Sequence, residues 1–331
     1  MLEVRDLEHG YGRRNVLAVD TFTIQTGTVT AVVGPNGSGK STLLRVLAFL
    51  ETPRAGILRL DGAPIRTPAE RRRARRRVTL VEQTPYLFAG TVQENMAYAL
   101  SLHGIRRTEG TGRARQALER VLASDLAQRR ADQLSNGEAQ RVAIARALAL
   151  EPAVLLLDEP ASAADRATST RLYQVLDEER SRGAAVCFAS HQLEDAYRWS
   201  DHLVALADGR TGLVTPENLF RTVLPDGGGS KTARVGPLDI RVVTDRVGPV
   251  TLAIPADEVL VSNTPLQSSA RNEFSGRVVR ISEHDRDRVT IIVDVGVDLA
   301  ARITPSALKE LDIQVGATVV LAVKALAVRV F

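Results

Sequence analysis

One nine-residue stretch combines the residue types that hold phosphate groups. Its glycines let the backbone curl so that N–H groups point at a phosphate. We expect Lys40 to reach the β- and γ-phosphates of a nucleotide and the Ser41 hydroxyl to bind Mg²⁺. The stretch consists of Gly34, Pro35, Asn36, Gly37, Ser38, Gly39, Lys40, Ser41 and Thr42.

The flanking residues predict the elements that position this stretch. Residues 28–33 form a short β-branched run that is typical of a strand, and Leu43, Leu44, Leu47 and Leu50 follow at helical spacing. Strand, glycine-rich loop and helix is the setting that a phosphate-binding P-loop requires, because the helix N-terminus adds partial positive charge. The alternative is a glycine-rich turn that matches by chance, and the full motif in this setting argues against it.

Two further predicted strands end in polar residues. Residues 153–157 are continuously apolar, which predicts a parallel strand buried on both faces, and Asp158 and Glu159 follow. Ligands of α/β sheets bind at such carboxyl ends. Because adjacent strand residues point to opposite sides, we expect one carboxylate to serve Mg²⁺ through water and the other to polarise an attacking water. The run 184–188 leads to His191, which is either a γ-phosphate sensor or a structural histidine.

Three other stretches are ambiguous by themselves. Gln83, after the predicted strand 78–81, could reach a metal or an attacking water, or be an ordinary loop glutamine. The stretch 134–141 predicts the start of a helix. This helix start is a second phosphate site, or it is an ordinary capping box formed by Ser135 and Glu138, or both interpretations hold. Tyr11 lies in a turn-like stretch and could stack on a purine, although a packing or surface tyrosine is the simpler interpretation.

The composition indicates a globular protein of about two domains. No apolar run is long enough to cross a bilayer, and no signal peptide is visible. The single cysteine, Cys187, fits a reducing compartment and lies in an apolar run, so we expect a buried, inert thiol. A net charge of +4 gives no argument for nucleic acid. The arginine-rich segment 71–77 is either a solvated face or a patch that faces a membrane surface or an anion.

The composition changes in the second half. Residues 225–230 form a glycine-rich cluster that predicts a linker. Regular short strands separated by turns predict a small β-barrel of the oligonucleotide/oligosaccharide-binding (OB) type. The predicted strands are 240–243, 250–254, 258–261, 274–281, 289–295, 300–303, 318–323 and 327–330, with a hairpin turn at 285–287 and a short helix at 305–311.

Three places in this half could hold an anion. Ser269, Ala270 and Arg271 supply a hydroxyl, small backbone sites and a guanidinium; Thr304 lies at a helix start; Lys324 stands beside Ala325. Hydroxyl and backbone donors with one or two cations suit a tetrahedral dianion. The alternatives are an ordinary N-cap at Thr304 before Pro305, and a turn at 269–272.

In order, these features resemble the ATPase subunit of ABC transporters, over residues 1–220. Tyr11, the P-loop, Gln83, residues 134–138, Asp158-Glu159, residues 162–165 and His191 correspond to that family's aromatic loop, Walker A, Q-loop, signature, Walker B, D-loop and H-loop. The resemblance implies an α/β P-loop fold with a RecA-like core, an antiparallel β subdomain and a helical subdomain. It also implies ATP and Mg²⁺ as cofactors.

The same resemblance implies a homodimer that clamps two ATP molecules. Lys40, Ser41, Gln83, Glu159 and His191 of one subunit would face Ser135 and Gly137 of the other. Three positions depart from the family pattern, and they put rate and dimer affinity in question more than activity. Asn136 replaces the first signature glycine, Glu138 replaces a glutamine, and Ala164 stands where leucine is common. Asparagine tolerates a left-handed backbone better than other non-glycine residues.

The C-terminal residues resemble the Mop/TOBE domain of molybdate and tungstate importers, over residues 266–331. The residues that carry this resemblance are Ser269-Ala270-Arg271-Asn272, Phe274, Gly276, Ile303-Thr304, Gly316 and Lys324-Ala325. The ATPase half is most similar to the same branch, through 134–141. The family implies that two such barrels pair and bind oxyanion between them, which reports the cytoplasmic supply. Related barrels in sulfate, sugar and polyamine importers do not bind the same ligand.

The resulting hypothesis is an ATPase subunit of an oxyanion importer at the cytoplasmic face of the cell membrane. Its domains are 1–222, a linker and accessory β segment at 223–265, and the barrel at 266–331. Glu159 is the expected general base, and Asp158 lies in the outer shell of Mg²⁺. The partners are an integral-membrane permease docked on residues 84–145 and a separate solute-binding protein, with no nucleic acid. The alternatives are an importer of another substrate with a structural barrel, a soluble ABC ATPase of translation or repair, and a non-transport oxyanion regulator.

Overall fold

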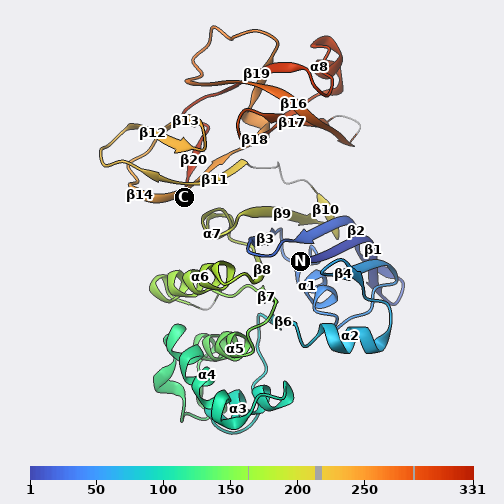
Figure 1. Ribbon diagram of the computed structural model, residues 1–331, viewed down its shortest axis with the longest axis vertical. Coiled ribbons are helices and arrows are strands. Elements are labelled where there is room, and N and C mark those ends of the chain that lie inside the picture. The colour runs from blue at the N-terminus through green and yellow to red at the C-terminus, as the bar shows by residue number, and fades with distance from the viewer. Residues whose placement is uncertain (163, 213–217, 286–287) are drawn as a thin grey trace. The chain divides into compact units, whose positions relative to one another are not determined.

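The computed structural model describes residues 1–162, 164–212, 218–285 and 288–331 (Figure 1). The chain forms two compact units, Met1–Gly212 and Leu213–Phe331. No helix among the described residues is long and apolar enough to cross a membrane.

A six-stranded sheet forms the centre of the first unit. Its strand order is β10-β9-β3-β8-β7-β6, and all neighbouring strands are parallel except β10 and β9. β3, β7 and β8 are buried along their whole length, as expected for a parallel sheet covered on both faces. The bounds are β3 Val29–Val33, β6 Val78–Val81, β7 Val154–Asp158, β8 Ala185–Ser190, β9 His202–Ala207 and β10 Arg210–Gly212.

The register of these strands brings the predicted polar residues to one edge. Val33, the last residue before the P-loop, pairs with Ser190, and Asp158 pairs with Ala189. Three loops that are far apart in sequence therefore leave the sheet side by side. Cys187 is fully buried in β8, and burial raises the pKa of its thiol, which confirms the prediction of a buried cysteine.

A four-stranded antiparallel sheet, in the order β2-β1-β4-β5, packs with the central sheet. Helix α1 (Lys40–Leu47) lies in the shared core, which takes side chains from both sheets. The prediction that Leu50 continues the apolar face of this helix is wrong. Phe49 adopts a φ of 58°, which ends the helix, and Leu50 is 54% exposed. The bounds are β1 Leu2–Tyr11, β2 Arg14–Ile24, β4 Ala55–Leu60 and β5 Ala63–Pro64.

Helix α2 (Pro68–Ala74) carries most of the arginine-rich segment. A capping box of Thr67 and Glu70 begins it. Arg77 is itself exposed and pairs with Asp61 at 2.7 Å; four more arginines of the segment are exposed. These four are Arg72, Arg73, Arg75 and Arg76.

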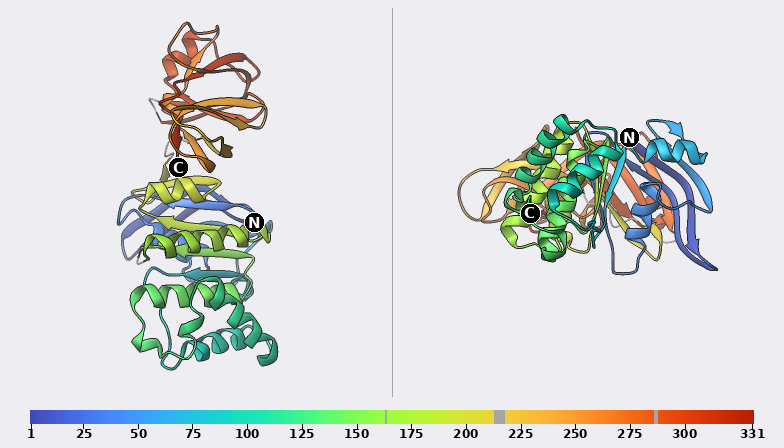
Figure 2. Two further views of the ribbon diagram at one scale, coloured as in Figure 1. Left: turned by 90° about the vertical axis from the view of Figure 1, so that its left-hand side faces the viewer. Right: turned by 90° about the horizontal axis from the view of Figure 1, so that it is seen from below.

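Three helices form a separate group in the first unit, drawn in blue-green to green in Figure 1 and Figure 2. They are α3 (Val92–Leu102), α4 (Arg107–Arg120) and α5 (Asn136–Ala149), with short 3₁₀ turns at Ser124–Leu126 and Ala131–Gln133. Both α3 and α4 pack on α5. This group is the predicted helical subdomain.

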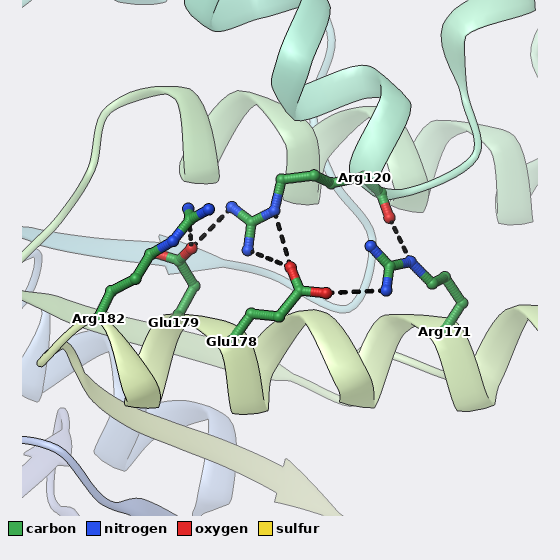
Figure 3. A network of polar contacts seen from close by, with 5 residues as sticks. All are labelled: Arg120, Arg171, Glu178, Glu179 and Arg182. Atoms are coloured by element: carbon green, nitrogen blue, oxygen red, sulfur yellow. Dashed lines mark hydrogen bonds and ion pairs between the residues drawn. The ribbon is translucent and has the colours of Figure 1, made fainter.

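Charged side chains join this group to helix α6 (Arg166–Ser181) of the central sheet layer (Figure 3). Arg120, at the end of α4, contacts Glu178 at 2.8 Å and Glu179 at 2.7 Å. Arg171 binds the other oxygen of Glu178, and Arg182 shares Oε1 of Glu179 with Arg120. Glu179 is only 4% exposed, so these partners replace the water that its carboxylate has lost.

The second unit contains a five-stranded antiparallel sheet in the order β15-β19-β16-β17-β18, a three-stranded sheet β11-β14-β20 and a hairpin of β12 and β13. Apolar side chains of all three parts form one core. The bounds are β11 Asn218–Leu224, β12 Ser230–Val235, β13 Leu238–Val243, β14 Gly248–Ile254, β15 Leu260–Ser262, β16 Asn272–Asp285, β17 Arg288–Asp294, β18 Asp298–Ile303, α8 Pro305–Glu310, β19 Thr318–Val323 and β20 Arg329–Val330. The predicted small β-rich domain is confirmed.

Some local predictions in this unit differ from the structure. Residues 225–229 of the predicted linker join β11 to β12 within the second unit, and Ser230 begins β12. The predicted strand 258–261 is wrong in part, because Ala256–Glu258 forms a 3₁₀ turn before β15. Two residues of the predicted turn at 285–287, Arg286 and Asp287, lie outside the described residues. The flanking strands β16 and β17 pair antiparallel.

Candidate functional site

The P-loop connects β3 to α1 at the carboxyl edge of the central sheet. Gly37 and Gly39 have φ values of 80° and 104°, which favour glycine. Gly34 is needed for space, because a Cβ there would lie 2.1 Å from the carbonyl oxygen of Leu206. Lys40 is 6% exposed, and its Nζ donates to the carbonyl oxygens of Gly34 at 2.8 Å and Pro35 at 3.1 Å. The lysine is therefore held inside the loop that would surround a phosphate.

Asp158 lies at the end of β7, next to the P-loop. It is 5% exposed, and its Oδ1 is buried without a hydrogen-bond partner among the described residues. Burial raises the pKa of Asp158; hydrogen bonding with Ser41 opposes this shift, and the Glu159 carboxylate adds to it. A buried carboxylate oxygen without a partner beside a hydroxyl group fits a hard cation such as Mg²⁺, which takes few protein ligands besides phosphate.

Glu159 lies between two of the predicted site residues. Its Oε2 accepts a hydrogen bond from Nε2 of Gln83 at 2.9 Å, and its Oε1 lies 3.1 Å from Nδ1 of His191. The backbone of Glu159 has a φ of 49°, an uncommon value for this residue type, and its N–H donates to Ala189. The Glu159 side chain is 10% exposed, whereas His191 is 47% exposed. The carboxylate therefore lies at the border between the sheet and solvent.

Tyr11 lies at the end of β1 and is 50% exposed. Its phenol donates to both carboxylate oxygens of Glu51, at 2.8 Å and 2.7 Å. The ring of His9 packs edge-on against it, with the centroids 5.3 Å apart. Sequence reasoning missed both Glu51 and His9. The alternation along β1 places His9 on the same strand two residues before Tyr11, but no local signal pointed to Glu51.

The signature residues lie at the start of α5. Ser135 is the N-cap and forms a capping box with Glu138, which also pairs with Arg129 at 2.8 Å. Hydrogen bonds from Ser135 lower the pKa of Glu138. Asn136 lies in the first helical turn and has no positive φ, so the expected need for a left-handed backbone does not arise. Among the described residues, no hydrogen bond or ion pair joins Ser135–Glu138 to the P-loop.

The segment after Gln83 carries exposed aromatic side chains. Tyr86 is 70% exposed, Phe88 42% and Tyr98 48%, and the rings stack edge-to-face from Tyr86 to Phe88 to Tyr98. A hollow of about 370 Å³ is lined by Tyr86, Phe88 and residues before α5 such as Asp132. This surface lies within the face 84–145 that the sequence predicts for a partner.

The predicted oxyanion residues fall into two groups in the second unit. The ladder of β16 and β19 ends at the pair of Asn272 and Val323, so Ser269–Arg271 and Lys324–Ala325 continue neighbouring strands. Thr304 follows Ile303, the last residue of β18. Ile303 pairs with Val289 of β17, and Val289 in turn pairs with Glu283 near the far end of β16. Thr304 is also the N-cap of α8, as the structural alternative predicted. The two groups therefore lie at opposite ends of β16.

Other parts of the expected site are less complete. Ala163, in the predicted D-loop, lies outside the described residues. Asp165 is the N-cap of α6 and accepts from the N–H of Thr168. Among the described residues, no three His, Cys, Asp or Glu side chains cluster as a metal site.

Comparisons with known proteins agree with this geometry. The family model described as "ABC transporter" matches residues 17–162, and the one described as "TOBE domain" matches residues 268–330. The chain is 42% identical to the phosphate import ATP-binding protein PstB 2 of Natronomonas pharaonis, over 63% of this chain and 78% of that protein. It is 31% identical to the molybdate/tungstate import ATP-binding protein WtpC of Pyrococcus horikoshii, over the whole length of both.

A solved structure gives the same result. The dimeric, post-hydrolysis structure of the ATP-binding cassette MJ0796, bound to ADP and Pi, has a TM-score of 0.59 and 27% identity. The match covers 64% of this chain and 96% of the MJ0796 chain. The chain therefore belongs to the ABC transporter family, as the ATP-binding, ATP-hydrolysing subunit of an importer, with a C-terminal TOBE domain.

Proposed function

We propose that this chain hydrolyses ATP to import a tetrahedral oxyanion, tungstate or molybdate, and that its C-terminal barrel senses the cytoplasmic oxyanion. The match to WtpC, a molybdate/tungstate import protein, carries this proposal because it spans both units. PstB 2, a phosphate import protein, has a higher sequence identity than WtpC, 42% against 31%, but its match covers only 63% of this chain. The candidate anion residues lie in the TOBE domain, so a relative that shares the whole chain is the better guide to the substrate.

In the proposed ATP site, Lys40 and the P-loop N–H groups hold the phosphates, and Tyr11 stacks on the adenine. Glu159 accepts a proton from a water that attacks the γ-phosphate. The contacts of its carboxylate with Gln83 and His191 support this role, because they restrict it to one orientation. His191 would leave this contact to sense the γ-phosphate.

The residues proposed for Mg²⁺ are Ser41, Gln83 and Asp158, the last through water. The unpartnered Oδ1 of Asp158 and the proximity of Ser41 support this assignment. Bound Mg²⁺ would neutralise negative charge on the β- and γ-phosphates. Signature residues Ser135–Glu138 would complete the site of a second copy in a homodimer. Their position at the N-terminus of a helix of 14 residues supports this, because such ends attract phosphate.

The two separate groups of oxyanion residues support a ligand bound between two barrels. Ser269–Arg271 and Lys324–Ala325 of one copy would face Thr304 of the other. The exposed aromatic hollow around Tyr86 and Phe88 supports docking of an integral-membrane permease, which keeps this subunit at the cytoplasmic face of the membrane. A separate solute-binding protein would deliver the oxyanion, and no nucleic acid takes part.

Calorimetric titration of the full chain tests the substrate. Tungstate and molybdate should bind tightly, whereas sulfate and phosphate should give no heat of binding. Lys324→Met should abolish binding, whereas Lys309→Met, which changes an exposed lysine of α8 outside the candidate set, should not. Absence of binding by any of the four anions, or preference for phosphate or sulfate, would favour the alternative of a structural barrel in an importer of another substrate.

A further inference from the structure

We propose that Glu51 positions Tyr11 against the base of the bound nucleotide and that His9 holds Glu51 in place. This inference rests on the proposed ATP site, in which Tyr11 stacks on adenine. Glu51 and His9 belong to no motif of the P-loop or of the catalytic carboxylates. They are positioning residues, because they would act on the nucleotide only through Tyr11.

The position of Tyr11 makes such support necessary. It is the last residue of β1, before a tight turn to Arg14 of β2, and half of its surface is exposed. An exposed aromatic side chain at a turn can adopt several rotamers. If stacking on the base restricts it to one rotamer, the lost conformational entropy lowers the affinity for the nucleotide. The single phenol O–H, which the two carboxylate oxygens of Glu51 share, selects one of these rotamers.

Glu51 is itself fixed by a buried ring. His9 is 6% exposed; its Nε2 lies 2.8 Å from Oε2 of Glu51, and its Nδ1 lies 3.1 Å from the carbonyl oxygen of Thr52. The His9 ring also packs edge-on against Tyr11, with an angle of 87° between the planes. The three side chains therefore contact one another in a closed triangle.

This triangle connects the aromatic turn with the phosphate-binding helix. Glu51 follows α1 by four residues, and Arg54 donates to the carbonyl oxygen of Gly12 in the turn. Burial and the hydrogen bond to Glu51 raise the pKa of Tyr11, while Thr42 and Arg45 of α1 oppose the shift. The phenol therefore stays protonated and remains a donor near the P-loop helix.

Binding of two ligands separates this role from general support of the fold. ATP contains the base, whereas inorganic tripolyphosphate contains only the phosphates. Tyr11→Ala should weaken ATP binding about fivefold or more, because stacking of one base is worth about 1–3 kcal/mol. Glu51→Ala and Tyr11→Phe should each weaken it about threefold to tenfold, which is the net scale of one ordinary hydrogen bond, because this pair lies at a half-exposed position. All three should leave tripolyphosphate affinity unchanged.

The double variant provides the decisive comparison. If Glu51 acts through the phenol, Glu51→Ala should have no further effect in the Tyr11→Phe background. Glu3→Ala is the matched control, because Glu3 has a similar exposure, 16% against 22%, and pairs with Arg5 away from Tyr11. It should bind both ligands as the unchanged protein does.

Different results would overturn different claims. Additive effects of Glu51→Ala and Tyr11→Phe, or an equal loss of tripolyphosphate affinity in Glu51→Ala, would reject the positioning role of Glu51 alone. Unchanged ATP affinity in Tyr11→Ala would reject the proposed stacking of Tyr11 itself.

Discussion

Arg120→Met should destabilise the first unit by about 2–3 kcal/mol. Arg120 is 11% exposed, and it is the residue through which α4 binds the carboxylates of α6 (Figure 3). Removal of one partner from a buried ion pair costs about 3–5 kcal/mol when the other charge is left alone. Here Glu178 keeps Arg171 and Glu179 keeps Arg182, so the expected cost is smaller.

Urea unfolding followed by tryptophan fluorescence measures this cost. The chain has a single tryptophan, Trp199, which lies in the first unit and stacks on Tyr173, so its signal reports that unit alone. With a slope of about 2–3 kcal/mol per M, the midpoint should fall by about 1 M. Arg130→Met is the control, because the pair of Arg130 with Asp132 is exposed on both sides; its midpoint should not change measurably.

The pH dependence follows from the carboxylate of Glu178. Burial alone would raise the pKa of Glu178, but hydrogen bonds from Arg120 and Arg171 outweigh it and lower the pKa below the ordinary value of 4.5. A lowered pKa gives stability that is present above the unfolded value and lost as the pH falls through the folded value. The difference in unfolding free energy between Arg120→Met and the unchanged protein should therefore shrink below about pH 4.5.

A decrease of the urea midpoint by less than about 0.3 M in Arg120→Met at neutral pH would refute the reasoning.

Three further predictions concern the ATP site. Glu159→Gln should keep ATP binding but slow phosphate release about 10²- to 10⁴-fold and accumulate an ATP-bound dimer; turnover near the unchanged rate would reject Glu159 as the base. Lys40→Ala should lose most affinity for a fluorescent ATP analogue, and unchanged binding would remove the P-loop from the account. Gly34→Ala should abolish ATP binding because its Cβ would meet the Leu206 carbonyl at 2.1 Å, whereas Gly37→Ala, with no atom within 4 Å, should weaken it less; equal effects would contradict the steric argument.

Long-range pairing explains how much of the ATP site the sequence could predict. The P-loop, Asp158 and His191 each follow a buried apolar strand, and parallel strands bring their carboxyl ends to one edge, so the sequence predicts their neighbourhood. Contacts made by single side chains are not encoded in such patterns. The bond of Tyr11 to Glu51 joins residues 40 positions apart, and neither the alternation of β1 nor the spacing of α1 indicates it.

The remaining differences have separate causes. The end of α1 depends on the left-handed φ of Phe49, a residue type that gives no stop signal, so the leucine spacing alone places Leu50 on the wrong side of the boundary. The glycine-rich residues 225–230 resemble a linker, yet the same composition suits a connection between two strands of one unit. The candidate oxyanion residues were chosen by residue type, and their separation along β16 follows only from the strand register.

The most direct test of the importer proposal is the metal content of cells. A strain that lacks this chain should be complemented with the unchanged protein or with Glu159→Gln, and tungsten, molybdenum and phosphorus should be measured by mass spectrometry. We predict that Glu159→Gln fails to restore tungsten and molybdenum while phosphorus stays the same. Restored tungsten and molybdenum in Glu159→Gln cells, or a loss confined to phosphorus, would contradict it.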